Sequence, residues 1–201
     1  MYTGRITEIG TVIETGSGLV IEAPKTATGL APGGSVNVSG TCLSAAMVDG
    51  SAGRFGVELS AETRTRSALG GLAPGARVNL ELPLHVGDPM DGHLVQGHTD
   101  AIGKVTKLDA EHGGLRVWIR PPKRFLDEIV AKGSVAVDGV SLTLVDVTPG
   151  GFSVMLIPHT LAVTTLGALR PGGRVNVEAD MLAKHVQRLI GDGEFFRYRS
   201  S

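Results

Sequence analysis

The 201-residue sequence contains a single cysteine, Cys42, and few aromatic residues: five Phe, two Tyr and one Trp. One cysteine excludes an intramolecular disulfide framework and a zinc site built from several cysteines. The formal net charge of -1 provides no general attraction for nucleic acid. No apolar run approaches the roughly 18 residues that a membrane-spanning helix needs.

The chain nevertheless has the composition of a folded protein. Hydrophobic residues make up 42% of it, which is enough to form a core. The length fits one domain of ordinary size or two domains of about 100 residues. Met1 to Arg5 lack the basic-then-apolar order of a signal peptide. We therefore expect a cytoplasmic protein without a nucleic-acid or membrane partner.

The sequence contains an internal repeat of about 95 residues. Residues 34–48 and 133–147 agree at seven of 15 positions with an offset of 99, and 59–82 and 156–179 agree at 11 of 24 with an offset of 97. The beginnings GRITEIGTV and GHTDAIGKV align at an offset of 93. Because the three matches keep the same order, we expect two homologous halves, 1–92 and 93–180, followed by a tail, 181–201.

Each half has the pattern of short strands joined by turns. The 29 glycines are about twice the usual share. Alternating apolar residues surround Ser39-Gly40 and Asp138-Gly139, which predicts β-hairpins. About six such strands in 90 residues predict a small closed barrel in each half. Short helices are expected at Thr63–Leu69 and Phe125–Ala131.

The tail has a different period. Leu182, Val186, Leu189 and Ile190 follow the spacing of an amphipathic helix over Met181–Ile190, and Asp180 can cap it. This apolar face packs either on a partner subunit or on the chain's own barrels.

The segments MYTGRITEIG, SGTCLS, GHLVQGHTD, KGSVAVDGVSLT, IPHTLAVTTLG and RVNVEAD resemble riboflavin synthase, and the resemblance extends from Met1 to about Ile190. It implies an all-β fold of two six-stranded Greek-key barrels and a C-terminal helix that helps to build a homotrimer. It also implies that each barrel binds one 6,7-dimethyl-8-ribityllumazine and that a four-carbon unit passes between the two molecules. The products are riboflavin and 5-amino-6-ribitylamino-uracil, and the reaction needs no metal or other cofactor. The active site would lie between the N-terminal barrel of one subunit and the C-terminal barrel of its neighbour.

The resemblance also carries the family's binding segments onto this chain. In the first half they are Gly4, Arg5, Ile6, Cys42, Leu43, Ser44, Glu58, Leu59, Ser60, Ala61, Glu62 and Thr63. At the junction they are Gly97, His98 and Thr99. In the second half they are Lys132, Asp138, Ser141, Leu142, Thr143, Ile157, Pro158, His159, Thr160, Leu161 and Ala162. Ser35 and Asp180 match further positions linked to the family's site.

The residue types suit this chemistry. The pteridine ring presents N–H and C=O edges, which hydroxyl and backbone groups can pair with. Ser44 is the repeat equivalent of Thr143, and Thr63 that of Thr160, which favours paired roles over those of ordinary strand residues. Cys42 is the equivalent of Ser141. It is either a nucleophile that adds to the electrophilic ring carbon or a small buried hydrophobic residue.

Histidines are the candidates for proton transfer. His98 matches the family's site histidine, and its side chain either takes a proton from the reactive methyl group or only forms local hydrogen bonds. A metal pair with His93 is a weaker alternative, because no cysteine or carboxylate set completes it. His85, His112 and His185 are expected in solvent, and His159 at the rim of a pocket.

Lys132 and Asp138 flank the second hairpin. Lys132 can contact the ribityl chain or a ring carbonyl. Asp138 serves either the site or only the Asp-Gly turn. Asp180 can act in the site and cap the helix at once.

Several positions depart from the family's pattern: Tyr2, Arg5, Ser39, Arg64 and Asp91-Gly92. Arg5 replaces an apolar residue, so its guanidinium must meet a carboxylate such as Glu8 or Glu58, a ligand, or solvent. These changes leave three readings open: a riboflavin synthase, a paralogue that binds a lumazine or flavin without turnover, and an enzyme for a related substrate.

Overall fold

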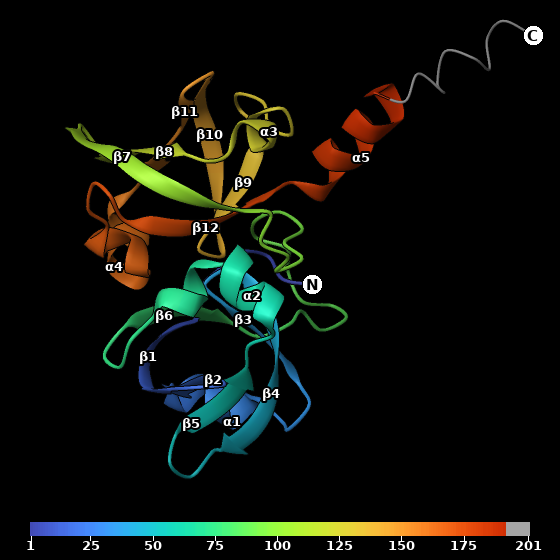
Figure 1. Ribbon diagram of the computed structural model, residues 1–201, viewed down its shortest axis with the longest axis vertical. Coiled ribbons are helices and arrows are strands. Elements are labelled where there is room, and N and C mark those ends of the chain that lie inside the picture. Colours follow the sequence, from blue (N-terminus) through green and yellow to red (C-terminus); the bar gives the residue numbers. More distant parts are fainter. Residues whose placement is uncertain (192–201) are drawn as a thin grey trace, which may run out of the picture.

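The computed structural model describes residues 1–191, which form two closed antiparallel β-barrels and one C-terminal helix (Figure 1). The first barrel contains β1 (Glu8–Thr15), β2 (Gly18–Glu22), α1 (Pro24–Gly29), β3 (Ser35–Val38), β4 (Thr41–Asp49), β5 (Arg54–Glu58), α2 (Ala61–Arg66), the 3₁₀ helix η1 (Ala68–Gly71) and β6 (Arg77–Glu81). The second contains β7 (Ala101–Glu111), β8 (Gly114–Arg120), α3 (Lys123–Leu126), β9 (Ser134–Val137), β10 (Val140–Thr148), β11 (Gly151–Leu156), α4 (Pro158–Val163), η2 (Thr165–Ala168) and β12 (Arg174–Ala179). The chain then continues into α5 (Met181–Gly191).

The two barrels have the same strand order. Around the first barrel the order is β1-β2-β5-β4-β3-β6, and β7 to β12 repeat it. The register shifts by one residue within β1, after Val12, and at the equivalent place in β7, after Val105. Such bulges bend a strand and increase its twist, which helps a short sheet to close. The expected all-β fold with two six-stranded barrels is therefore confirmed.

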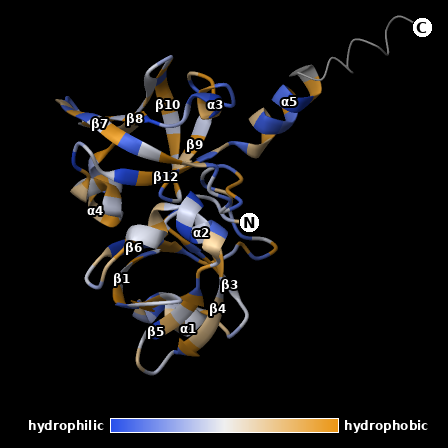
Figure 2. Cartoon of the chain, viewed as in Figure 1, coloured by the Kyte–Doolittle hydropathy of each residue, from blue (hydrophilic) through white to orange (hydrophobic). Residues whose placement is uncertain are grey.

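Alternating burial explains the strands. In β10 the apolar residues at Val140, Leu142 and Leu144 face inward, while Thr143 is exposed. Figure 2 shows this alternation of hydrophilic and hydrophobic residues along β7 and β12. The core of the second barrel is mostly aliphatic and contains two aromatic residues, Phe125 and Phe152, whose ring centroids lie 6.1 Å apart.

Both predicted hairpin turns are present. Ser39 and Gly40 have φ values of 43° and 86°, and Asp138 and Gly139 have values of 45° and 78°. Positive φ at both central residues matches the twist of the strands that the turn joins.

The short helices differ in extent from the prediction. Instead of one helix at 63–69, α2 ends at Arg66 and η1 begins at Ala68, because the Ser67 side chain caps η1 by accepting a hydrogen bond from Leu69 N. In the second half, α3 ends at Leu126 rather than continuing to 131. Lys132 already has a φ of 68°, and its N–H donates to Leu144 O in β10, so the chain must leave the helix before it.

The barrels meet through pairs of equivalent groups. Asn79 Oδ1 accepts a hydrogen bond from Thr165 N at 2.8 Å, and Asn176 Oδ1 accepts one from Ala68 N at 2.6 Å. The two hairpin turns approach each other at Gly40 and Gly139. The duplication is therefore expressed as an approximate two-fold arrangement within one chain.

The helix α5 projects away from both barrels (Figure 1). Asp180 Oδ1 accepts a hydrogen bond from Leu182 N at 3.0 Å, as expected for a cap. Leu182, Val186 and Leu189 are exposed, so this face does not pack on the chain's own barrels. The Ile190 side chain and residues 192–201 lie outside the described residues. Within residues 1–191, no helix has the length and apolar character to cross a membrane.

Candidate functional site

The segments that lead into the two barrels cross over to the opposite half. Tyr2 and Val95 form an isolated antiparallel bridge, with Tyr2 N donating to Val95 O at 2.8 Å. Gly4 O then accepts from Ser141 N at 2.9 Å, in the second barrel. In return, Gly97 O accepts from Cys42 N at 2.7 Å, in the first barrel. Each leading segment therefore lies along the other barrel's wall.

A buried glutamate holds each crossing segment. Glu81, at the end of β6, accepts hydrogen bonds from the backbone N–H groups of Thr3 and Gly4. Its repeat equivalent Glu178 accepts from three successive N–H groups, at 96–98. Burial raises the pKa of both carboxyls above the usual range, while the N–H donors act in the opposite direction. These two residues were not predicted, although their equivalent positions in the repeat were visible.

The crossing requires glycine at two equivalent positions. Gly4 and Gly97 both have a φ of 77°. A Cβ at Gly4 would lie 2.5 Å from Ser141 N, and one at Gly97 would lie 2.8 Å from Cys42 N. A side chain at either position would therefore push the leading segment off the wall of the opposite barrel.

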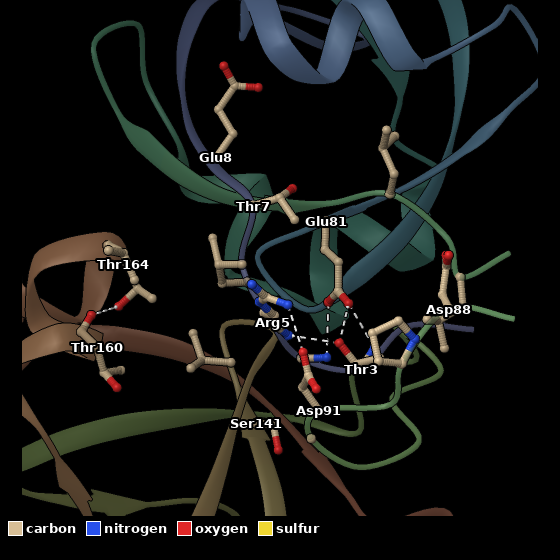
Figure 3. Close-up of a pocket in the computed structure, with 18 of the residues that line it drawn as sticks. Thr3, Arg5, Thr7, Glu8, Glu81, Asp88, Asp91, Ser141, Thr160 and Thr164 are labelled. Carbon is tan, nitrogen blue, oxygen red and sulfur yellow. Dashed lines mark hydrogen bonds and ion pairs between the residues drawn. The ribbon is translucent and has the colours of Figure 1, made fainter.

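The first crossing segment borders a cavity of about 770 Å³, here called the Ser141 cavity (Figure 3). In the close-up, the first barrel lies above it and the second barrel below, with Arg5 and Asp91 between them. The predicted residues that line it are Gly4, Arg5, Ile6, Ser141, His159 and Thr160. Gly4, Arg5 and Ile6 thus lie with Ser141, His159 and Thr160 of the second half, and not with Cys42 and Thr63 of their own half.

The second crossing segment borders a smaller cavity of about 260 Å³, here called the Cys42 cavity. The predicted residues that line it are Cys42, Ser60, Glu62, Thr63, Gly97, His98 and Thr99. Nearly every one is the repeat equivalent of a residue lining the Ser141 cavity. The duplication therefore produces two related cavities, and each takes its wall from both halves.

Ser141 is hydrogen-bonded to a histidine. Its Oγ lies 2.7 Å from His93 Nδ1, while His93 Nε2 is buried and has no partner among the described residues. Burial lowers the pKa of His93 below its usual value, and the negative charge of Asp180 partly offsets this. A neutral imidazole in this position can exchange a proton with the serine hydroxyl. From the sequence, His93 was expected only as a weak metal ligand, and its place in the segment GHLVQGHTD was the sole signal for this role.

Cys42 has a different neighbour. The Tyr2 hydroxyl donates to Cys42 Sγ at 3.2 Å, and Tyr2 is fully buried. Burial, followed by the contact with Cys42, raises the pKa of this hydroxyl far above its usual value, so it remains a donor. The departure at position 2 therefore acts directly on the thiol.

Arg5 has a carboxylate partner, but it is neither Glu8 nor Glu58. Arg5 Nη1 lies 2.6 Å from Asp91 Oδ2, and both side chains are exposed. Glu8 instead accepts hydrogen bonds from Lys25 N and Thr26 N at the start of α1. A carboxylate and solvent were both among the expected alternatives for Arg5. The carboxylate is Asp91 because the crossing brings position 5 next to the segment before β7, which sequence distance could not reveal. The other unusual arginine, Arg64, donates to Gly16 O.

The remaining predicted residues lie at varied distances from these cavities. His98 is exposed at the mouth of the Cys42 cavity, and its N–H donates to Glu178. Asp138 faces a separate groove of about 820 Å³ between the barrels and accepts from Asn176 N at 2.7 Å. Leu161 and Ala162 line that groove as well.

Other predicted residues contribute to strands and turns. Three of them are buried in the barrels: Leu43, Leu59 and Leu142. Ser35 pairs with Ser44 between β3 and β4. The others line none of the cavities described above; they are Glu58, Ala61, Lys132, Thr143, Ile157 and Pro158.

The histidines outside the cavities are exposed as expected, at His85, His112 and His185. Within residues 1–191, no group of three His, Cys, Asp or Glu side chains is arranged to hold a metal ion. The His93 and His98 pair therefore has no third ligand in the described part of the chain.

Comparison with known proteins agrees with this geometry. The family model described as lumazine binding domain matches residues 3–83 and 96–180. The chain is 40% identical over 199 residues to riboflavin synthase from Mycobacterium tuberculosis, covering 94% of this chain and 98% of the relative. It is 38% identical over 197 residues to that from Brucella abortus, with the same coverage. For the Bacillus subtilis enzyme the identity is 31% over 195 residues, covering 94% and 90%.

Solved structures share the fold at lower identity. LumP in complex with riboflavin superimposes with a TM-score of 0.80 at 22% identity, covering 89% of this chain and 99% of LumP. LumP with 6,7-dimethyl-8-(1'-D-ribityl) lumazine gives a TM-score of 0.78 at 20% identity, with the same coverage. The repeat, the paired cavities and the full-length relatives agree: the chain belongs to the riboflavin synthase family and carries two lumazine binding domains in tandem.

Proposed function

We propose that the protein is a riboflavin synthase. It converts two molecules of 6,7-dimethyl-8-ribityllumazine into riboflavin and 5-amino-6-ribitylamino-uracil by moving four carbons from one molecule to the other. The observation that carries the proposal is the pair of repeat-related cavities, because this reaction uses two copies of one substrate. The full-length relatives named riboflavin synthase support it.

In this proposal the two cavities have different chemical roles. One substrate must lose a proton from its ring methyl group, and the other must accept a nucleophile at the equivalent ring carbon. His98, at the Cys42 cavity, is exposed and able to take the proton. In the Ser141 cavity, the Ser141 hydroxyl beside His93 can donate a hydrogen bond or add to the ring. Cys42, with Tyr2 donating to its sulfur, is the corresponding group in the first cavity.

We also propose that the working unit is a homotrimer in which the Cys42 cavity of one subunit faces the Ser141 cavity of its neighbour. The exposed apolar face of α5 is available for this contact. Lys184 on the same helix pairs with Asp100 at 2.5 Å, directly after Thr99. The helix is therefore tied to the segment that lines the Cys42 cavity. The division into 1–92, 93–180 and 181–201 fits this scheme, since each barrel closes within its half.

The test is incubation of the purified protein with 6,7-dimethyl-8-ribityllumazine, followed by riboflavin fluorescence. We expect one riboflavin for every two lumazines consumed. We further expect His98→Ala to lower kcat about 100-fold, the lower end of the effect of a positioned proton-transfer group. His112→Ala, an exposed histidine outside both cavities, is the matched control and should leave kcat unchanged. Full activity in His98→Ala would rule out the proposed role of His98.

A second function follows from the LumP structures, which hold riboflavin and the lumazine as bound ligands. If the protein binds the lumazine with normal affinity but forms no riboflavin, it is a binding protein and not a synthase. If neither binding nor turnover is found, the departures at Arg5 and Asp91 point to a related substrate.

A further inference from the structure

Two departures from the family's pattern meet in the structure. Arg5 stands in place of an apolar residue and Asp91 in place of a glycine, and they form an ion pair although 86 positions separate them. Both line the Ser141 cavity. We propose that the Ser141 cavity selects a ligand with an anionic group, such as a terminal phosphate, which Arg5 binds in place of Asp91. This proposal rests on the proposed function only in assuming that the ligand contains a lumazine or flavin ring.

The carboxylates of this cavity already have partners. Glu8 accepts two backbone N–H groups at the start of α1, and Glu81 accepts those of the crossing segment. Asp88 Oδ2 accepts from His85 N at 2.8 Å. Asp91 has Arg5. Backbone N–H donors therefore stabilise Glu8, Glu81 and Asp88, and Asp91 is the acidic side chain that an incoming anion must displace from Arg5.

The cations of the cavity retain unused donors. Arg5 donates through Nη1 to Asp91, and a guanidinium has five N–H groups. Lys25, on the same cavity lining, donates from Nζ to Thr7 O at 3.2 Å and has two further protons. Two positive groups beside hydroxyl-bearing threonines form a suitable environment for a phosphate, which accepts bidentate hydrogen bonds from arginine.

The ion pair is able to exchange its anion. The Arg5 side chain is 69% exposed and that of Asp91 is 49% exposed. Water screens such a pair, so it contributes little to stability and is easily broken. A ligand phosphate carries more charge than one carboxylate and offers more acceptor atoms, so it competes well for Arg5. Without a ligand, Asp91 keeps Arg5 beside the cavity.

The experiment compares riboflavin with riboflavin 5′-phosphate, which differ by one phosphate, in a binding titration followed by flavin fluorescence. At low ionic strength we expect the wild-type protein to bind the phosphate at least about fivefold more tightly, and added salt to reduce this ratio. Arg5→Gln should bring the ratio to about one, because it removes the guanidinium that would bind the phosphate. Arg5→Lys should give an intermediate ratio, and Asp91→Asn should raise the ratio, because it frees Arg5.

Two controls locate the effect. Arg54→Gln removes an exposed arginine that pairs with Asp49 away from the cavities, and it should leave the ratio unchanged. Arg66→Gln removes an arginine that lines the Cys42 cavity, and it too should leave the ratio unchanged. The proposal is overturned if the wild-type ratio is about one, if Arg5→Gln preserves the preference, or if Arg66→Gln abolishes it.

The outcome is separate from that of the turnover assay. Lumazine turnover with equal affinity for both flavins would refute anion selection and leave the synthase proposal intact. If the protein prefers the phosphate, Arg5→Gln removes that preference and no lumazine is turned over, anion selection is supported and the synthase proposal is refuted.

Discussion

Asp138 shows how the duplication places a titratable group at an unusual position. It occupies the left-handed turn before β10, where the first half has Ser39, and it faces the groove between the barrels. Burial raises the pKa of Asp138 to about 7, and the hydrogen bond from Asn176 N only partly opposes this. Its folded-state pKa thus lies above that of the unfolded carboxyl, 3.8. The stability that this protonation contributes is complete below about pH 4 and is lost as the pH rises through about 7.

Asp138→Asn is therefore expected to stabilise the protein at high pH. Asparagine imitates the protonated carboxyl, accepts the same hydrogen bond and tolerates a positive φ. At pH 8.5 we expect the free energy of unfolding to rise by about 1–2 kcal/mol relative to wild type, and the difference to vanish near pH 4. Urea denaturation at both pH values measures it. The exposed Asp127→Asn should show no such pH dependence, and an equal effect of Asp138→Asn at both values would contradict the argument.

At the level of single residues, the sequence predicted several of the cavity-lining side chains but not the residues that form hydrogen bonds or ion pairs with them. Ser141 and Cys42 lie on their cavities as equivalent residues. The partner of Arg5 and the hydrogen bond from His93 to Ser141 depend on the crossing of the leading segments. Local patterns report period and turn type, but a bridge such as that from Tyr2 to Val95 spans 93 residues, and nothing in the sequence near either residue marks it.

At the level of elements, α5 has an exposed apolar face, at Leu182, Val186 and Leu189, although Lys184 ties the helix to Asp100. We expect Leu182→Gln combined with Val186→Gln to shift the protein from trimer to monomer in sedimentation experiments. The reason is that burial of this apolar face would be the main gain on association. The thermal unfolding of the barrels should change little, because these side chains are exposed in the single chain.

Gln187 provides the control for α5. At about 100° of rotation per residue it lies outside the apolar face formed by Leu182 and Val186, so Gln187→Ser should leave the sedimentation coefficient unchanged. If the wild-type protein sediments as a monomer at micromolar concentration, the proposed trimer is wrong.

The strands and turns were more predictable than the short helices. Period-two burial and the Ser-Gly and Asp-Gly turns each act over a few residues, so they are visible in the sequence. The end of α2 depends instead on the Ser67 cap, and that of α3 depends on Lys132 pairing with β10. Such contacts form only after the barrels close.

At the level of the whole molecule, the two barrels contact each other through the glycines of their hairpin turns, Gly40 and Gly139. A Cβ on Gly139 would lie 2.8 Å from Gly40 N, and the φ of Gly139 is 78°. We expect Gly139→Ala to lower the free energy of unfolding by about 2–4 kcal/mol, since it adds a backbone clash to the strain of a positive φ. Thermal or urea denaturation measures the change.

Gly172→Ala separates these two causes. Gly172 has a φ of 90°, but a Cβ there would have no atom within 4 Å. It should therefore cost only the conformational strain, about 1 kcal/mol. Equal costs at both glycines would show that the contact between the hairpin turns contributes nothing.

The crossing of the leading segments also sets an order of events during synthesis. Gly4–Ile6 are synthesised before Ser141, so they cannot form their contact with the second barrel until Ser141 has been made. The first barrel is fully translated by Glu81, yet its cavity lacks Gly97–Thr99, which belong to the next half. A nascent chain that has finished only one barrel therefore contains no complete cavity, and ligand can assist folding only after both halves have been made.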